Sequence, residues 1–440
     1  MKRLTAPARR PAPLRRSDIP AGAGPAGAGP ARRASGTGSV LSAILDHGPV
    51  ARSNVARLTG LSPAAVTGHV GHLLARGLVR ESAETAGPKG LGRPHIPVEI
   101  DTGRYLVAGA HVAVAHSTVS LMDLRGRIVA EDRQPHAIGA MGPYATVPGR
   151  SPRGLSSGPA LLRDLADRLP RLVEAHGAGR TVLALGFATG HRVDPAAGVV
   201  VDHPHLGWRD VPVRAILESA TGLPVHVDSH SRALARAEQL FGEASTRAST
   251  VLLFVGAVVD AAFASSGAMH LGPRSGAGSV AHLPLGSGGS GGAEPCSCGR
   301  TGCLQSEVSE RAMVRRAAEQ GLIVNSFTEL LDRALAGDAR ALALFRRRAR
   351  LVGRGAALLL DMFDPEVLVV VEPGAGRIPE CLADLRAEVA ERSWVCEDPE
   401  RAVVPSSFTG SVLATAGGAV ALGALYTDPL GPWPALPAVS

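Results

Sequence analysis

The run Cys296-Ser297-Cys298-Gly299-Arg300-Thr301-Gly302-Cys303 places three cysteines within a single short loop. A fourth soft ligand, His282, lies a short distance upstream. Three thiolates and one imidazole make up the Cys3His set of a closed, tetrahedral structural zinc site. A disulfide is the alternative, but Cys296 and Cys298 are too close to bridge comfortably, and three cysteines leave one over. The sequence therefore predicts a Zn²⁺ site with His282, Cys296, Cys298 and Cys303 as its ligands.

The composition indicates a globular protein of two or three domains. The chain has 440 residues, 45% of them hydrophobic, which is enough to bury a sizeable core. Five cysteines do not form a disulfide framework, and this favours a reducing compartment. The sequence has no apolar run of about 18 residues, the length that a membrane span needs. We therefore expect a cytoplasmic protein that does not enter a membrane.

The positive charge of the chain is concentrated at its N-terminal end. Residues 1–100 carry 14 Lys and Arg against 5 Asp and Glu, whereas the remaining residues carry 32 against 34. A basic head on a near-neutral body indicates that the head contacts a polyanion, and a merely solvated tail is the alternative. Residues 1–36 are rich in Ala, Gly and Pro with paired arginines, so we expect a disordered basic tail there.

Residues 37–100 predict a winged helix-turn-helix unit. Helices are expected over 38–46, 53–58 and 62–76, with Ser53 capping the second, and strands follow Gly77 and span 96–100. Ser62 and Pro63 have the residue types of an N-cap and a first helical position. An ordinary three-helix packing module is the alternative to this motif. The positions expected to be buried are Val55, Leu58, Leu61, Val66, Val70, Leu73 and Leu74.

From Tyr105 onward the pattern predicts an α/β body with two lobes over residues 101–428, followed by a C-terminal tail at 429–440. The expected strands are 106–114, 117–123, 128–132, 181–187, 225–227, 250–255 and 367–371. The expected helices are 160–176, 211–221 and 231–241, and residues up to Trp208 are expected to form a loop.

The order of these features resembles the ROK family, which joins sugar kinases to transcriptional regulators on an actin-like, RNase H-like ATPase fold. The resemblance covers roughly residues 38–425. It rests most on His282 with the cysteine run, and on residues 225–238, which match the segment that carries the catalytic aspartate of the kinases. Leu206-Gly207-Trp208 and Phe363-Asp364-Pro365 are similar to further family motifs. The N-terminal winged helix-turn-helix resembles the regulator branch, because the kinases lack it.

The same resemblance implies that kinase activity has been lost. His230 stands where the family's catalytic aspartate is expected. The first phosphate loop, at 109–114, has one glycine and no carboxylate, and the second, at 256–262, has one glycine where the kinases have a cluster. Glu372-Pro373 replaces the adenine-side glycine pair. We therefore expect the chain not to be an enzyme.

The sugar-binding positions that the resemblance implies are also altered. Ser279 stands in place of a sugar-binding carboxylate, and Gln305 in place of a glutamate. A polar pocket without carboxylates for a small, sugar-like effector is one interpretation, and a cleft that binds no effector is the other. The residues assigned to the pocket are Ser229, His230, Ser279, His282 and Gln305.

Residues near the start of helix 62–76 are candidates for contact with double-stranded DNA. Thr67 and His69 carry hydrogen-bonding groups for base edges, and Ala64 carries a methyl group for contact with thymine. Ser62 begins the helix, and Arg52 is a candidate for a phosphate contact. Arg93 lies in the wing loop, in a Gly-Arg-Pro similar to that of the family's regulators, where an arginine suits a narrow minor groove.

The sequence is thus identified as a ROK-type transcriptional repressor that binds a palindromic operator as a homodimer or homotetramer. Its kinase-like body would serve dimerisation and effector binding. An active carbohydrate kinase is one alternative function. A zinc-stabilised interaction protein that binds no specific DNA is another.

Overall fold

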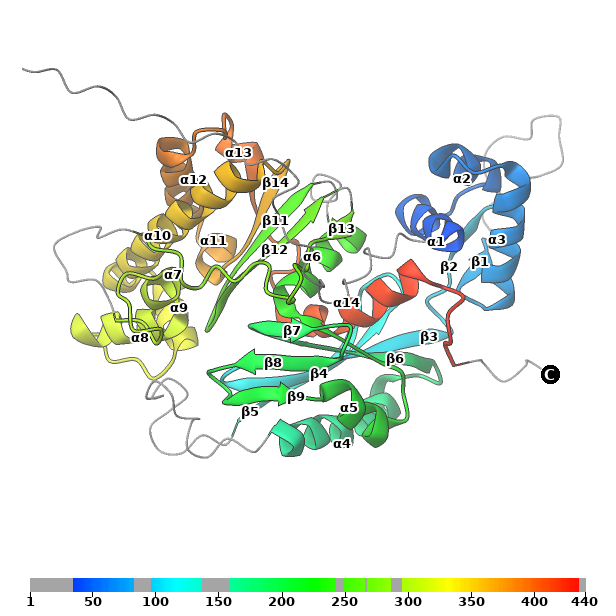
Figure 1. The fold of residues 1–440 in the computed structure, drawn as a ribbon, viewed down its shortest axis with the longest axis horizontal. Coiled ribbons are helices and arrows are strands. Elements are labelled where there is room, and N and C mark those ends of the chain that lie inside the picture. Colours follow the sequence, from blue (N-terminus) through cyan, green and yellow to red (C-terminus); the bar gives the residue numbers. More distant parts are fainter. Residues whose placement is uncertain are drawn as a thin grey trace, which may run out of the picture. The chain divides into compact units, whose positions relative to one another are not determined.

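The computed structural model describes residues 35–82, 96–136, 158–242, 249–265, 267–285 and 295–434 (Figure 1). The N-terminal unit has the predicted order of three helices and two antiparallel strands. Ser62 caps the third helix, because its hydroxyl accepts a hydrogen bond from the N–H of Ala65 at 3.2 Å. Ser53 does not cap the second helix, since Ala51 precedes it and provides no side-chain bond. The elements are α1 (Gly36–His47), α2 (Arg52–Thr59), α3 (Pro63–Ala75), β1 (Val79–Glu81) and β2 (Val98–Ile100).

The buried side chains of the N-terminal unit continue into the body of the protein. Val66 and Val70 of α3 are fully buried, as predicted, whereas Leu58 is 42% exposed and was wrongly assigned to the core. The same apolar cluster includes Leu422 and Leu425 of α14 (Val412–Thr427). The C-terminal helix therefore shares a hydrophobic core with the N-terminal unit.

The first large sheet has the strand order β10-β6-β3-β4-β5. β4 pairs with β3 and β5 in antiparallel fashion, whereas β6 and β10 run parallel to β3. Every residue of β3 is buried, which is typical of a central strand covered on both faces. The strands are β3 (Tyr105–Val112), β4 (His116–Asp123), β5 (Ile128–Pro135), β6 (Thr181–Thr189) and β10 (Val225–Ser229).

The second sheet repeats this plan, with the order β13-β12-β11-β14-β15. β12 is antiparallel to β11, and β14 and β15 are parallel to it. The predicted strands 250–255 and 367–371 have the bounds that the structure shows. The strands are β11 (Thr250–Val255), β12 (Val259–Ser265), β13 (Ala268–Met269), β14 (Val367–Val371) and β15 (Val403–Pro405). Two lobes with related sheets confirm the predicted α/β architecture.

A small third sheet was missed by the sequence interpretation, which expected a loop up to Trp208. It consists of β7 (Arg192–Asp194), β8 (Val199–His203) and β9 (Trp208–Val211). Its strands are only three to five residues long. Such short segments show too few alternations of apolar and polar residues for period-2 patterning to be recognised.

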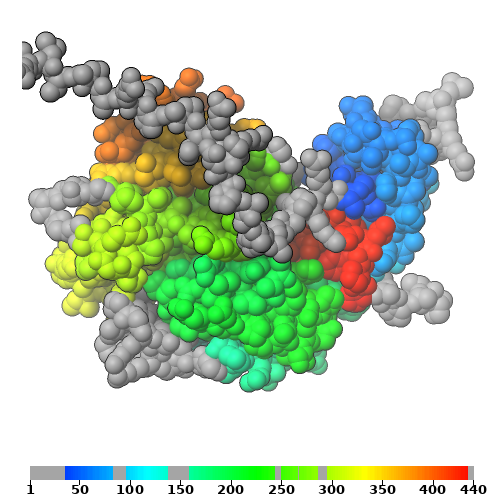
Figure 2. Space-filling view, in the orientation of Figure 1, coloured from blue at the N-terminus to red at the C-terminus, as the bar shows by residue number. Residues whose placement is uncertain are grey.

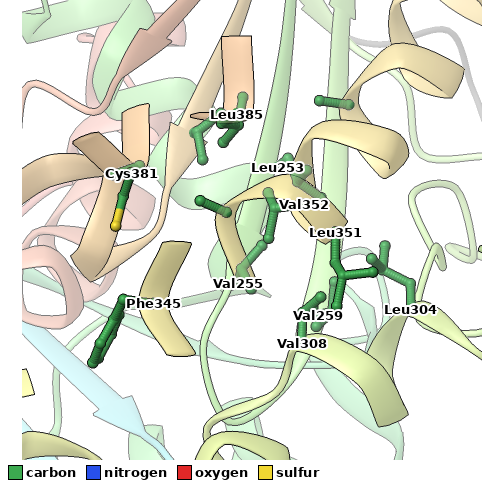
Figure 3. Packing of buried hydrophobic residues seen from close by; sticks show 14 of the residues in the cluster. Leu253, Val255, Val259, Leu304, Val308, Phe345, Leu351, Val352, Cys381 and Leu385 are labelled. Atoms are coloured by element: carbon green, nitrogen blue, oxygen red, sulfur yellow. The ribbon is translucent and has the colours of Figure 1, made fainter. Parts of the chain in front are cut away.

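Helices cover the sheets of both lobes, and α6 and α14 pack against each other. The second lobe has an extensive core in which Leu253 and Val255 of β11 meet Val352 and other side chains from the helices (Figure 3). In the space-filling view this lobe forms a continuous surface coloured from yellow-green to orange (Figure 2). The helices of the body are α4 (Gly158–His176), α5 (Val213–Thr221), α6 (His230–Phe241), α7 (Leu304–Val308), α8 (Glu310–Glu319), α9 (Phe327–Leu335), α10 (Ala339–Phe363), α11 (Pro373–Arg377), α12 (Pro379–Arg392), α13 (Pro399–Ala402) and α14.

Glycines let α14 lie directly on the first sheet. A Cβ atom on Gly109 of β3 would lie 2.5 Å from the backbone nitrogen of Gly418. One on Gly186 of β6 would lie 2.2 Å from the carbonyl oxygen of Gly417. Gly109, which the sequence interpretation assigned to a phosphate loop, therefore has a packing role, because a side chain there would push the helix away. Among the described residues, none of the helices is both long and apolar enough to cross a membrane.

Candidate metal centre and effector cavity

The four predicted zinc ligands lie together. The ligand atoms of His282, Cys296, Cys298 and Cys303 are all within 4.8 Å of one another. The Sγ of Cys296 is 3.4 Å from Nδ1 of His282, and the Sγ of Cys298 is 3.7 Å from that of Cys303. In a tetrahedral site with metal–ligand bonds of about 2.0–2.3 Å, the ligand atoms are about 3.5–3.8 Å apart. The donor set and its spacing therefore fit a tetrahedral metal ion.

The local backbone ties this cluster to the body. Cys303 immediately precedes α7, whose first residue, Leu304, donates its N–H to the carbonyl of Leu283 at 2.9 Å. The next N–H, of Gln305, bonds to the carbonyl of Ala281 at 2.8 Å. Leu304 and Val308 of α7 are fully buried in the core of the second lobe (Figure 3). A metal ion at the cluster would thus cross-link the loop to the start of a core helix.

A cavity of about 370 Å³ opens beside the metal cluster and contains part of the predicted effector set. Ser279, His282 and Gln305 line it. The amide of Gln305, however, is already bonded at both ends: its oxygen accepts from the N–H of Val259 at 2.7 Å, and its nitrogen donates to the carbonyl of Ala257 at 2.8 Å. Gln305 therefore forms part of the wall of the cavity, and both ends of its amide are bonded within the protein.

Two predicted effector residues are not part of this cavity. Ser229 is buried and caps α6 by accepting the N–H of Arg232, with its hydroxyl also 3.3 Å from that of Ser231. His230 faces a different, smaller space, where its ring stacks with that of His111. Ser229 and His230 therefore do not line this cavity with Ser279 and His282, although Nε2 of His230 lies 3.3 Å from Oδ2 of Asp260, which does.

Carboxylates line the cavity, contrary to the prediction of a pocket without them. Asp260 of β12 is buried, and its Oδ2 accepts the backbone N–H of His191 at 2.9 Å and lies 3.3 Å from Nε2 of His230. Burial acts to raise the pKa of Asp260, but the adjacent His230 and His191 hold it at about 2. Asp202 and Asp210 complete the acidic lining. A carboxylate within an otherwise apolar strand was the sequence signal for Asp260, and it was overlooked.

Histidines from residues 191–205, around β7 and β8, gather at this site. The ring centroids of His191 and His203 are 4.6 Å apart, and those of His191 and His205 are 5.2 Å apart. Burial lowers the pKa of all three, that of His205 to about 4 and that of His203 well below its usual value. The rings are therefore uncharged near neutral pH. His191 and His205 line the cavity, where a neutral imidazole can both donate and accept a hydrogen bond, whereas Nδ1 of His203 already accepts the N–H of Leu206 at 3.3 Å. Such groups suit an uncharged, polyhydroxylated ligand.

The buried histidines predict that acid destabilises the protein. His111, His116, His191, His203 and His205 all have folded-state pKa values below the usual 6.5, chiefly because of burial. The unfolded chain therefore binds more protons than the folded chain once the pH falls below about 6.5, and stability that is complete above that pH is lost below it. Each such histidine contributes up to about 1.4 kcal/mol per pH unit.

We expect the melting temperature to fall steeply between pH 7 and pH 5, as measured by calorimetry. The double variant His191→Gln, His205→Gln should show a shallower fall than the wild type. Replacement of the exposed His72 is the control. Equal slopes in the double variant and the wild type would contradict this assignment.

The space between the two loops that the family's kinases use for phosphates is nearly filled. It has a volume of about 60 Å³. The ring of His230 lies 4.0 Å from that of Phe254 and 5.7 Å from that of His111, all three between the loops. Glu372, at the adenine-side position, is buried and bonds to Arg348 at 2.5 Å.

The predicted DNA-contacting residues differ in their exposure. Ser62, Ala64 and Thr67 are exposed along one side of α3. His69 is half-buried, and its Nδ1 bonds to the hydroxyl of Thr37 in α1 at 2.9 Å. His69 therefore joins two helices and is not free for a base contact as predicted.

The remaining predicted contacts lie outside α3. Arg52 forms an ion pair with Glu81 at 3.1 Å and stays partly exposed. Arg93 and its wing loop lie outside the described residues. Gly68, as expected, is exposed on α3, and so are Gly71 and His72, which the sequence interpretation did not include. Gly71 and His72 lie between two and three turns after the N-cap, and the helical period was a usable signal for including them.

Comparison with known proteins gives relatives that cover most of the chain. The ROK family profile matches residues 161–426. A transcriptional regulator of Mycobacterium bovis is 33% identical over 412 residues, covering 90% of this chain and 87% of that protein. A putative xylose repressor of a Caldicellulosiruptor species is 26% identical, covering 81% of this chain and 88% of its own. An N-acetylglucosamine repressor of Escherichia coli is 26% identical, covering 78% and 80%.

Solved structures show the same fold. A ROK family transcriptional regulator, described as a homologue of the E. coli MLC protein, superposes with a TM-score of 0.69 at 20% identity and covers 89% of this chain and 96% of its own. A ROK hexokinase of Thermus thermophilus has a TM-score of 0.53 at 26% identity and covers 72% of this chain and 99% of its own. With the family profile matching more than half of its length, the chain belongs to the ROK family.

Proposed function

We propose that this protein is a DNA-binding transcriptional repressor whose kinase-like body has become an effector-binding and dimerisation module. The observation that carries the proposal is the unit of α1, α2, α3, β1 and β2 at the N-terminus, which has the order of a winged helix-turn-helix. Relatives over most of the chain are named as repressors. The hexokinase covers about three quarters of the chain, as expected if the kinases lack this unit.

The exposed side of α3 is the surface proposed to enter the major groove. Ser62, Ala64 and Thr67 belong to its N-terminal half, the part of a recognition helix that contacts base edges. Arg52 and the wing residue Arg93 supply the proposed phosphate and minor-groove contacts. With few long polar side chains on α3, much of the specificity would come from the wing and from the spacing of two half-sites.

The proposal includes loss of kinase activity. The side chains of His111, His230 and Phe254 fill the space between the former phosphate loops. The Arg348–Glu372 pair is completely buried, so the adenine-side position serves the core of the second lobe. Without room for phosphates, ATP-dependent phosphoryl transfer has no site.

The metal of the Cys3His cluster is proposed to be Zn²⁺ in a structural role. Four protein ligands close the coordination sphere and leave no open position for a substrate or an activated water molecule. Bound zinc would supply a cross-link between His282 and the loop that precedes α7. The effector cavity depends on the same segment, since Ser279, Ala281 and Ser297 line it.

The effector is proposed to be a small, uncharged, polyhydroxylated molecule of the sugar class. Its cavity combines uncharged histidines with the carboxylates of Asp202, Asp210 and Asp260. Carboxylates accept hydrogen bonds from pairs of hydroxyl groups, and neutral imidazoles both donate and accept them. The volume of about 370 Å³ is within the range of small-molecule sites.

A gel shift with DNA from upstream of the gene tests the proposed function. We expect a specific, salt-dependent shift, and we expect Arg93→Ala to weaken it by about tenfold or more if the wing reads the minor groove. Far-UV circular dichroism and zinc content should be unchanged in the variant. Adding D-glucose, N-acetylglucosamine or D-xylose in turn tests the effector, and Asp202→Asn should lose any response. Release of ADP with one of these sugars would instead favour the kinase.

The proposed homodimer has a candidate surface on the second lobe. Met362 is 63% exposed and Trp394 is 94% exposed. The carboxylate of Asp361 accepts the N–H of Trp394 at 2.9 Å, so the end of α10 and the loop after α12 are held together there. A contiguous exposed apolar patch indicates an interface, and a two-fold axis would bury it against itself. Leu358, Phe363 and Val395 complete the patch.

We expect Met362→Asp to shift the protein from dimer to monomer in sedimentation velocity, because the contact would place two carboxylates near the axis. Ile323→Asp is the control, since Ile323 is also strongly exposed, at 83%, but is not part of the patch. A dimer that persists in Met362→Asp would place the interface elsewhere.

A further inference from the structure

A second cavity of the protein is separate from the effector cavity. It has a volume of about 540 Å³ and shares no lining residue with the cavity beside the metal cluster. It lies between the edge strand β10, helices α5, α6 and α14, and the C-terminal residues up to Trp433. Its size is that of a site for a small organic molecule.

Part of the wall is apolar. α14 contributes Ala419, Val420, Gly423 and Ala424, and the aliphatic stem of Arg236 packs over Gly423, where a Cβ atom would lie 3.0 Å from the Cγ of the arginine. Across from them, the rings of Trp433 and His226 lie with their centroids 5.5 Å apart. The indole N–H of Trp433 already donates to the carbonyl of Asp428 at 2.8 Å, so the tryptophan offers the cavity only its apolar ring. Such a wall favours a planar, aromatic ligand.

The same cavity contains cationic groups that are incompletely paired. Arg236 donates one hydrogen bond, to the carbonyl of Gly267 at 3.3 Å, and within the described part of the chain no carboxylate lies within ion-pair distance of it. Arg232 is only 2% exposed and spends its Nε on Asp228 and its Nη2 on the carbonyl of Val193. A guanidinium has five N–H donors, so both arginines retain donors that an anion would satisfy.

Two other charged groups of the cavity, Arg214 and Glu218, are already engaged. Arg214 donates to the carbonyls of Pro195, Ala196 and Val225. Glu218 accepts the N–H of Val225 at 3.3 Å. Among the arginines that line the cavity, Arg236 is thus the one with the least satisfied charge. Burial also lowers the pKa of Arg236, with Asp228 acting against that effect, so a bound anion would relieve an unfavourable state.

From these contacts we propose that the cavity is a second ligand site, which takes a planar aromatic or heteroaromatic carboxylate. The ring packs on α14 and Trp433, and the carboxylate pairs with the guanidinium of Arg236. This site differs from the proposed sugar site in both position and chemistry, because it combines an apolar floor with an unpaired cation.

The cavity also borders the DNA-binding unit. Thr427, at the end of α14, lines it, and its carbonyl accepts the N–H of Ser35 at 3.2 Å at the start of α1. Arg76, directly after α3, donates to the carbonyl of Leu430 in the same C-terminal segment at 3.4 Å. A ligand that orders this segment would therefore act on α1 and α3, an effect that rests on the proposed function.

Isothermal titration calorimetry of the full chain with 2-naphthoate tests the site directly, with uncharged 2-naphthamide as the matched probe. We expect 2-naphthoate to bind, Arg236→Gln to weaken it at least tenfold and Arg236→Lys to weaken it less. The affinity for 2-naphthamide should be the same in the wild type and in Arg236→Gln. Trp433→Ala should weaken the binding of both probes. Arg209→Gln, in the other cavity, is the matched control and should change the affinity for neither probe.

The proposed site is contradicted if 2-naphthoate does not bind, or if it binds Arg236→Gln as tightly as the wild type. It is also contradicted if Arg209→Gln weakens the binding of 2-naphthoate. Melting temperatures show whether each variant is folded. If Arg236→Gln does not fold, the comparison of Arg236→Lys with the wild type still tests the site. A gel shift with and without 2-naphthoate tests the link to DNA. A change in the DNA affinity of the wild type that Arg236→Gln does not show supports the link. If the affinity does not change, the link to DNA is wrong but the ligand site is unaffected. If the protein binds no DNA, calorimetry still decides the site.

Discussion

Replacing Cys296 with serine is expected to remove the bound metal and to lower the melting temperature by on the order of 10 °C. A serine hydroxyl is a poor zinc ligand compared with a thiolate, and the remaining three ligands would leave the site open. The loss of a structural zinc costs several kcal/mol, because the ion binds the folded loop and not the unfolded chain. Metal content by mass spectrometry and unfolding by calorimetry measure the two effects.

The effect should extend from the metal to the effector cavity and then to DNA. Leu304 and Gln305 directly follow Cys303 and bond back to Leu283 and Ala281, so loosening the loop loosens a wall of the cavity. We expect weaker operator binding in Cys296→Ser and in protein treated with a chelator. Cys396→Ser is the matched control, because Cys396 is a half-buried cysteine outside the metal cluster. Zinc-free protein with wild-type stability and DNA affinity would contradict the structural role.

Gly68→Glu is expected to abolish operator binding while it stabilises the fold. Gly68 is exposed in the middle of α3, and a Cβ atom there would meet nothing within 4 Å. Removing a glycine from a helix interior stabilises the helix by about 0.5–1 kcal/mol. The new carboxylate would face the phosphates and base edges of the operator, and such juxtaposed negative charge costs several kcal/mol, or about 100-fold or more in affinity.

Opposite effects on stability and binding make this a sharp test of which surface meets DNA. Gly68→Ala should stabilise the fold to a similar degree and retain most of the binding. Gln320→Glu adds the same charge at an exposed position at the end of α8 and should leave DNA binding unchanged. If Gly68→Glu binds the operator as the wild type does, α3 does not enter the groove.

The zinc ligands and most of the secondary structure were predictable because their signals are local. Cys296, Cys298 and Cys303 lie in one loop, where thiolates so close in sequence are necessarily close in space. The buried strands 250–255 and 367–371 are continuous apolar runs between turn residues, so their bounds were read correctly. β7, β8 and β9 were missed, because three to five residues do not establish a period.

The effector cavity was predicted less well, because its composition depends on which strand and helix ends meet. Ser229 and His230 adjoin each other in sequence, but the start of α6 turns Ser229 into a helix cap and His230 toward Phe254. Asp260 comes from β12, in the other lobe from His191 and His205. Their proximity is a property of the packed lobes, and no spacing rule in the chain indicates it.

By itself the sequence determined the donor set of the candidate metal cluster, the helical head and the two-lobed α/β body, since each is written in neighbouring residues. Only the tertiary structure decided the composition of the two cavities: histidines and carboxylates from both lobes line one, and an arginine without an ion pair lines the other. Local patterns determine conformation through the backbone, whereas binding sites depend on long-range packing. The metal loop is the exception, because its ligands are held together by the chain itself.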